Sequence, residues 1–189
     1  MRRTSLLVVL LAGCAHTPVE SATPSWKLLS ATPEITEIQF QTTDNLNRAT
    51  VTDAGARGPF VDLKRGSGTI TGTIRVDWPV ELQLKGGKEI VGRFAGDTFE
   101  LTVTPDGEEF RAQGFVRGDQ TTFWMSPRRI RGSVGQCRFD LVWGAGRYTG
   151  SRTCGQLSED SVSLLLPASL AAWSDPEVAS LLAMITPRF

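Results

Sequence analysis

The side chains that serve most often in catalysis are scarce in this chain, and its potentially reactive groups are mainly carboxylates. His16 is the only histidine, which excludes His-based nucleophile triads and zinc sites with several imidazole ligands. The sequence contains no GxSxG motif and no P-loop. Paired carboxylates alone suffice for many glycoside hydrolases. The candidate carboxylates are Asp77, Glu81, Glu100, Asp106, Glu108, Glu109, Asp119 and Asp140.

None of these carboxylates stands out by its sequence context. Most lie beside turn signals or on polar faces of strand-like segments, where acidic side chains usually serve solubility and ion pairing, because they are rarely buried. We expect Asp140 to form a cross-strand ion pair, with Arg152 within its reach. The sequence therefore predicts no catalytic residue, no metal site and no cofactor, and a carboxylate-dependent glycan hydrolase stays an alternative.

Charge is unevenly distributed along the chain, although its 20 basic and 20 acidic residues balance. Residues 111–152 contain eight arginines and only Asp119 and Asp140 as acids, whereas residues 81–109 contain seven acids against three basic residues. Segregated charge creates a local field that attracts polyanions or an acidic protein surface. The alternative interpretation is that these arginines occupy solvated outward positions of strands.

Trp124 lies within the basic segment and directly follows Phe123. Neighbouring residues of a strand point to opposite faces, so one of the two aromatic side chains can be exposed. Exposed aromatic residues beside arginines are typical of binding surfaces. The candidate binding residues are therefore Trp124, Arg128, Arg129 and Arg131, and the expected partner is another protein or an anionic glycan.

The N-terminal residues have the layout of an export signal, in which basic residues precede a short apolar run and a small-residue cleavage site. The run over residues 6–11 leads into Leu11-Ala12-Gly13-Cys14, which resembles the lipobox of bacterial lipoproteins. The resemblance implies cleavage before Cys14, acyl chains such as palmitate on that cysteine, and, with Ala15 rather than aspartate next, anchoring in the outer membrane. The apolar run is too short for a transmembrane helix, which needs about 20 residues, whereas two acyl chains anchor a protein stably.

Three regions follow from this layout. Residues 1–13 are the predicted signal peptide, and residues 14–34 are the lipidated cysteine and a flexible tether rich in Pro, Ser and Thr. Residues 35–189 are predicted to form a single β-rich domain.

Once Cys14 carries lipid, Cys137 and Cys154 are the remaining cysteines, and an oxidising compartment favours a disulfide between them. A two-residue turn at Ala145-Gly146, between two strand-like segments, sets a register that places the two cysteines opposite each other. Opposed residues of a non-hydrogen-bonded antiparallel pair lie about 4.5 Å apart at Cα, which a disulfide tolerates. A redox or metal pair is the alternative, although the spacing is not CxxC.

Glycines recur in the middle of strand-like runs at intervals of 18 to 22 residues. They are Gly72, Gly92, Gly114, Gly132 and Gly150. Turn signals such as Gly86-Gly87 lie between them, and apolar residues alternate with polar ones, as around Leu101. This pattern predicts a mainly β fold, an antiparallel up-and-down meander of roughly ten strands, as a sheet or a barrel. A parallel β-solenoid, whose coils also take about 20 residues, is the rival architecture.

Each recurrent glycine occupies an apolar-face position, where a glycine often marks a bend or a close approach. Three interpretations stay open: curvature of a barrel wall, a trough for a C-terminal helix, or a trough for an external ligand. Residues 43–60 mix Asn, Asp, Gly and Pro, and we expect them to form a long connection or an irregular hairpin.

The composition becomes helical after Pro167, and the sequence predicts a helical segment over residues 167–186, with helices over 168–173 and 176–185. Ser174 or Asp175 is the expected N-cap. Apolar residues on one stripe of the second helix need a hydrophobic surface, which the apolar face of the sheet provides. The residues of this stripe are Val178, Leu181, Leu182 and Ile185.

The sequence thus favours a lipoprotein anchored in the outer membrane, facing the periplasm, that acts as a non-catalytic binding or assembly module of the cell envelope. A nucleic-acid partner is not expected for a protein in that place. A carrier of a lipid or another apolar ligand, held against the concave face of the sheet, is an alternative.

Overall fold

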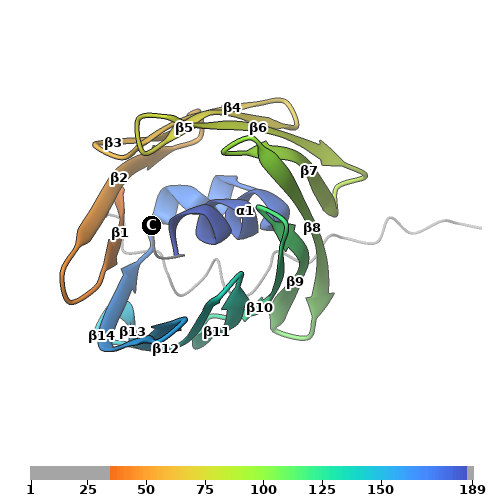
Figure 1. The fold of residues 1–189 in the computed structure, drawn as a ribbon. Helices are drawn as coiled ribbons and strands as arrows, with labels where there is room; N and C mark the ends of the chain where they lie inside the picture. Colours follow the sequence, from red (N-terminus) through yellow and green to blue (C-terminus); the bar gives the residue numbers. More distant parts are fainter. Residues whose placement is uncertain (1–34, 187–189) are drawn as a thin grey trace, which may run out of the picture.

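Fourteen β-strands form one antiparallel meander that closes into a barrel around a C-terminal helix (Figure 1). The computed structural model describes residues 35–186. The predicted signal peptide, Cys14, His16 and the tether of residues 14–34 lie outside the described residues. Each strand pairs with its sequence neighbours, and the first strand pairs with the last to complete the ring.

The strands are joined mostly by tight turns. In chain order they are β1 (Glu37–Gln41), β2 (Leu46–Thr52), β3 (Gly55–Gly58), β4 (Val61–Gly66), β5 (Thr69–Ile74), β6 (Trp78–Lys85), β7 (Glu89–Phe94), β8 (Asp97–Asp106), β9 (Glu109–Val116), β10 (Asp119–Met125), β11 (Arg129–Val134), β12 (Cys137–Gly144), β13 (Arg147–Cys154) and β14 (Leu157–Leu165). Two helical elements follow, the 3-10 helix η2 (Ala168–Ala172) and the α-helix α1 (Asp175–Ile185).

The predicted antiparallel meander is confirmed, but the expected number of about ten strands is too low. The glycine-bearing part of the chain does form ten strands, β5 to β14, and residues 37–66 add four more. Asp53 and Pro59 lie in turns between these additional strands, so residues 43–60 are no long connection. Their inward side chains, such as Ala49 and Ala56, are small, which is why the apolar alternation is weak there.

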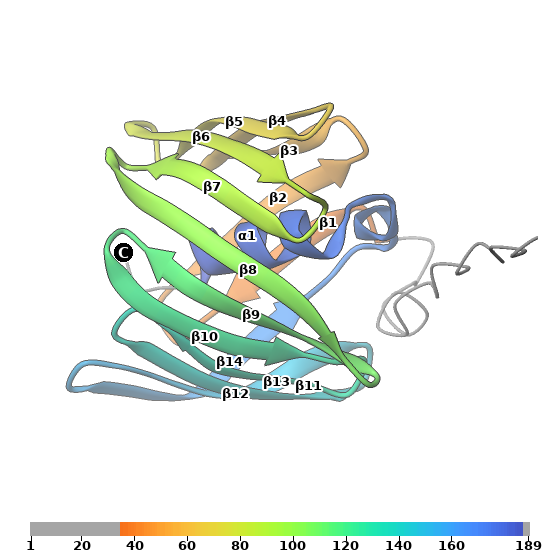
Figure 2. The ribbon, with the colours of Figure 1, turned by 90° about the vertical axis from the view of Figure 1, so that its right-hand side faces the viewer.

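The inward face of the barrel is apolar and the outward face is polar. In β8, Phe99 and Leu101 are fully buried, whereas Thr98 and Glu100 between and beside them are exposed. The same alternation continues around the ring, so the hydrophobic core lies inside the barrel. Figure 2 shows the strands surrounding α1 from the side. Because burial of apolar surface is the main favourable term in folding, the filled interior stabilises the closed barrel.

The recurrent glycines lie at inward positions of alternate strands, from β5 to β13. At each of them an added Cβ atom would lie 1.9–2.3 Å from a carbonyl oxygen of the neighbouring strand. The strand backbones therefore approach more closely there than any side chain allows. Glycine kinks of this kind bend the wall of a barrel. Of the three interpretations of the glycine row, curvature of the barrel wall is the one that these contacts support.

The C-terminal helix lies inside the barrel (Figure 1). Residues 176–185 of α1 are all buried, so the predicted stripe covers only part of the helix surface in contact with the core. The sequence predicts helices packed on the apolar face of the sheet, and α1 does contact that face. The expected number of two α-helices is wrong, because residues 168–172 form only a 3-10 helix. A closed barrel surrounds its helix on every side, which an amphipathic stripe does not reveal.

No helix among residues 35–186 combines the length and apolar character needed to cross a bilayer.

Hydrogen bonds fasten the chain where it turns into the barrel. The buried Trp173 side chain donates from Nε1 to the carbonyl oxygen of Thr52 at 2.9 Å. Ser174, one of the two N-cap candidates from the sequence, is the N-cap of α1. The Glu177 carboxylate accepts hydrogen bonds from the backbone N–H and the hydroxyl of Ser174. Arg65 of β4 donates to the same carboxylate from Nε at 2.8 Å and from Nη2 at 3.1 Å. The start of α1 is thus tied to the barrel wall.

These contacts determine the charge state of Glu177, which is only 2% exposed. Burial alone would raise the pKa of its carboxyl, but the hydrogen bonds from Arg65 and Ser174 and the charge of Arg65 outweigh burial, and the pKa is lower than its ordinary value. A carboxyl whose pKa is lower in the folded state stabilises the fold above its unfolded pKa. That contribution is lost as the pH falls through the folded pKa.

Replacing Glu177 by Gln should therefore lower the free energy of unfolding by about 1–3 kcal/mol at neutral pH, because hydrogen bonds to a charged group are lost. The difference from the wild type should shrink on acidification below the ordinary carboxyl pKa of 4.5. Urea unfolding at a series of pH values measures this difference in the free energy of unfolding. Asp62→Asn, which removes an exposed ion pair with Arg57, is the control and should show a small difference throughout. A pH-independent loss in E177Q would contradict the role assigned to its charge.

The predicted disulfide joins Cys137 and Cys154, which lie directly opposite each other in the pairing of β12 with β13. Their Cα atoms are 4.0 Å apart. The turns that follow the odd-numbered strands form this end of the barrel, which we call the disulfide end. Thr186, just after α1, accepts a hydrogen bond of 2.9 Å at its carbonyl oxygen from Arg152 Nη1. The helix therefore runs through the barrel toward the disulfide end.

Candidate binding site

Strand register aligns Trp124 with two arginines on the outside of the barrel. In β10, Trp124 lies opposite Arg111 of β9 on one side and opposite Arg131 of β11 on the other. Phe123, one residue earlier, is fully buried, so Trp124 points outward, as the alternation of neighbouring residues requires. The predicted split of the two aromatic residues between opposite faces is confirmed.

Both arginines stack with the indole ring. The guanidinium carbon lies 5.3 Å from the ring centroid for Arg111 and 5.2 Å for Arg131, distances at which the charge is attracted to the ring face. Nε of Arg111 is buried and has no hydrogen-bond partner among the residues that the structure describes. A desolvated donor without an acceptor costs free energy.

Two other arginines of this surface are partly neutralised by acids, Arg129 by one on the adjacent strand β12 and Arg131 by one on β9, across β10. Arg129 donates from Nε to the Asp140 carboxylate at 2.7 Å, and Arg131 pairs with Glu109 at 3.0 Å. The hydrogen bond from Arg129 lowers the pKa of the Asp140 carboxyl. Arg128 lies in the turn between β10 and β11 and is exposed.

We call Arg111, Trp124, Arg128, Arg129 and Arg131 the arginine–tryptophan patch. The structure brings all four predicted binding residues together in it, over the outward side of β10, β11 and the turn between them. Four arginines face two carboxylates, so the patch keeps an excess of positive charge.

The expected reach of Arg152 to Asp140 is wrong. Asp140 lies opposite Ser151 in the register of β12 and β13, so Arg152, the next residue, points to the inside of the barrel. There Arg152 is 4% exposed and donates from Nε to Glu159 at 2.8 Å. Asp140 pairs with Arg129 on its other neighbouring strand instead. One residue of register decides the face of a strand.

Arg111 is the member of the patch that the sequence did not single out. The turn between β9 and β10 could have predicted its position beside Trp124. This two-residue turn at Arg117-Gly118 places Val116 opposite Asp119, and the same register places Arg111 opposite Trp124.

The carboxylates show the surroundings expected from the sequence. Six of the eight candidates are exposed, and the half-buried Glu109 and Asp140 are ion-paired with arginines. Within residues 35–186 no group of three or more His, Cys, Asp or Glu side chains is arranged to hold a metal ion.

No protein-family model matches this chain, and comparison with curated proteins and with solved structures finds no similar protein.

Proposed function

We propose that this protein is a lipoprotein, anchored in the outer membrane through Cys14 and facing the periplasm, that acts as a non-catalytic binding module of the cell envelope. The arginine–tryptophan patch is its contact surface, and its partner is an acidic surface of another envelope protein. The proposal rests on the lipobox-like N-terminus and on the arrangement of the patch.

The position of Trp124 between two arginines is the observation that carries the proposal. Side chains already held in place lose little freedom on binding, and tryptophan and arginine are the residues that most often dominate interface energies. The exposed guanidinium of Arg128 offers hydrogen-bond donors to the carboxylates of a partner. The excess of positive charge favours an acidic partner over a basic one.

The interior of the barrel favours this function over a carrier of apolar ligands. Helix α1 and the inward side chains fill the space that a cargo would need. Transport inside the barrel would require the whole helix to leave, with the loss of its buried contacts.

Reversing Arg128, Arg129 and Arg131 to Glu should weaken binding of the partner by at least about tenfold, enough to abolish its capture, because repulsion replaces attraction at three nearby positions. A photoreactive residue at the exposed Gln113, beside Arg111 in β9, should cross-link the partner in intact cells. The cross-link should disappear in the triple variant.

Two controls sharpen this test. The first control is a triple variant with Glu in place of Arg48, Arg57 and Arg93, which are exposed on other strands. It makes the same change of charge away from the patch and should leave the cross-link intact. A photoreactive residue at Lys64 of β4 should not capture the same partner. Loss of the cross-link in both triple variants, or in neither, would contradict the proposed contact surface. Capture of a glycan instead of a protein would make the anionic-glycan alternative the correct one.

A further inference from the structure

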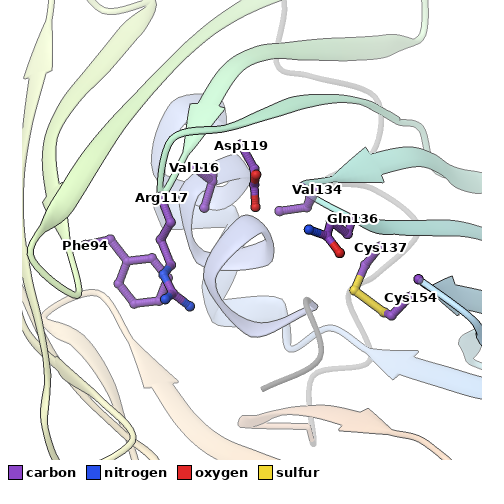
Figure 3. Close-up of a pocket in the computed structure, with 10 residues that line it drawn as sticks. Phe94, Val116, Arg117, Asp119, Val134, Gln136, Cys137 and Cys154 are labelled. Carbon is purple, nitrogen blue, oxygen red and sulfur yellow. A yellow bond between two sulfur atoms is a disulfide. The ribbon is translucent and has the colours of Figure 1, made fainter.

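A cavity of about 460 Å³ opens at the disulfide end of the barrel, on a different surface from the arginine–tryptophan patch (Figure 3). Its volume falls in the range of small-molecule sites, roughly 300–1,000 Å³. The cavity lies among the hairpin turns at this end, beside the end of helix α1 (Figure 3). Nothing described so far assigns it a role.

The lining divides into an apolar floor and a polar rim. Phe94, Val116 and Val134 are buried side chains of the floor, and the disulfide between Cys137 and Cys154 completes it. The rim carries the exposed side chains of Arg117, Asp119 and Gln136. Small-molecule sites commonly combine an apolar lining with a few such polar groups.

The positively charged side chain of the rim, Arg117, already has interaction partners. The Arg117 guanidinium lies 4.5 Å from the centroid of the Trp78 ring and 3.5 Å from the Asp97 carboxylate. In Figure 3 its side chain lies beside Phe94, while Asp119 and Gln136 lie on the side of Val134. Arg117 is thus directed toward its own partners and does not neutralise Asp119.

The acceptors of the rim are left for a ligand. Within residues 35–186 the Asp119 carboxylate makes no ion pair, and the Gln136 side chain makes no hydrogen bond. The two residues belong to neighbouring hairpins, β9–β10 and β11–β12. The carboxylate of Asp119 and the side-chain oxygen of Gln136, both at the rim, are acceptors that suit a cationic N–H donor.

Backbone strain at the same end is a second, independent observation. Arg75, Val76 and Arg117 have φ values of +52°, +27° and +56°, in a region that is costly for residues other than glycine and most costly for a β-branched residue such as valine. Strained residues of this kind cluster at binding sites, where the surrounding structure holds them. Arg75 and Arg117 both stack with Trp78, so the strained turn at Arg117 holds the cation of the rim on one side of the cavity.

We propose that this cavity binds a small organic amine. The ammonium group donates to Asp119 and to the side-chain oxygen of Gln136, and the apolar body of the amine lies on Val116, Val134 and the disulfide. The neutral disulfide and valine floor selects for an apolar body, and the free carboxylate selects for positive charge.

Hexylamine, hexan-1-ol and hexanoate are suitable probes, because they share an apolar body and differ in charge. Titration of the ¹⁵N-labelled full-length chain should show saturable shifts of amides at the disulfide end with hexylamine. Hexanol should bind about tenfold more weakly, since hydrogen bonds to charged groups are stronger than neutral ones, and hexanoate weaker still.

The variant Asp119→Asn keeps the shape of the side chain and removes its charge, and it should lower the affinity for hexylamine to that for hexanol. Asp106→Asn makes the same change of charge at the opposite end of the barrel and should leave hexylamine binding within about twofold of wild type. Equal binding of the amine and the alcohol by the wild type, a preserved amine preference in D119N, or shifts confined to other parts of the barrel would each overturn the proposal. The amide spectrum of each variant reports directly that it is folded.

Discussion

Replacing Gly92 by alanine should destabilise the barrel by about 4 kcal/mol or more, which is at the upper limit for single substitutions. Gly92 has φ of +155°, and a Cβ atom there would lie 1.9 Å from the carbonyl oxygen of Glu81 and 2.9 Å from Cα of Leu82. Both contacts involve backbone atoms of β6, so no side-chain rotation relieves them. The wall must open at this point, and the hydrogen bonds between β6 and β7 must lengthen.

A glycine two residues past the end of the same strand is a matched control. Gly96 also has a positive φ, +86°, but an added Cβ would meet nothing within 4 Å. Gly96→Ala therefore carries only the cost of a left-handed backbone, about 1–2 kcal/mol. Urea unfolding of the two variants measures the difference. Equal losses would show that φ alone, and not the close approach of the strands, is the reason for glycine at position 92.

Replacing Arg152 by methionine should cost about 3–5 kcal/mol, because it removes one partner of a buried ion pair and leaves the other uncompensated. Glu159 is 15% exposed in this pair, and Arg152 also donates to the carbonyl oxygen of Thr186 at 2.9 Å. The variant thus loses the charge that stabilises Glu159 and the hydrogen bond that fastens the chain just after α1.

Two further variants separate these contributions. The double variant Arg152→Met with Glu159→Gln should recover part of the lost stability, since the uncompensated carboxylate is gone. Arg57→Met removes an exposed ion pair and should change the free energy of unfolding by about 1 kcal/mol or less. Thermal or urea unfolding gives all three values. A loss for R152M no larger than for R57M would show that the buried pair does not hold the end of the chain.

Arg152 occupies a position that is apolar in the other repeats. Two residues after the recurrent glycine, the chain has Ile74, Phe94, Val116 and Val134 in β5, β7, β9 and β11, all buried. In β13 the same position holds Arg152. This repeated position therefore predicts that the Arg152 side chain points inward. A buried guanidinium needs a hydrogen-bond acceptor nearby. That acceptor comes from β14 and from the end of the helical segment, which no local pattern relates to β13.

What the sequence determines by itself is local. The alternation of apolar and polar residues marks the strands after Thr69, and the turn at Ala145-Gly146 sets the register that joins Cys137 to Cys154. The N-cap of the last helix is narrowed to Ser174 or Asp175. Each of these depends on residues close together in the chain or on one hairpin. Period, turn chemistry and capping are properties of short segments, so they can be read without knowledge of the rest of the molecule.

Only the tertiary structure decides closure, the place of the helix and the surroundings of the candidate sites. Whether a meander closes depends on twist and bending summed over all strands, including β1 to β4, whose small inward residues give a weak pattern. Once the ring closes, it encloses α1 on every side, brings Thr186 at the end of the helical segment to Arg152, and brings Asp119 and Gln136 from separate hairpins to one cavity. These contacts join residues that are distant in sequence, and their energies depend on the closed barrel as a whole.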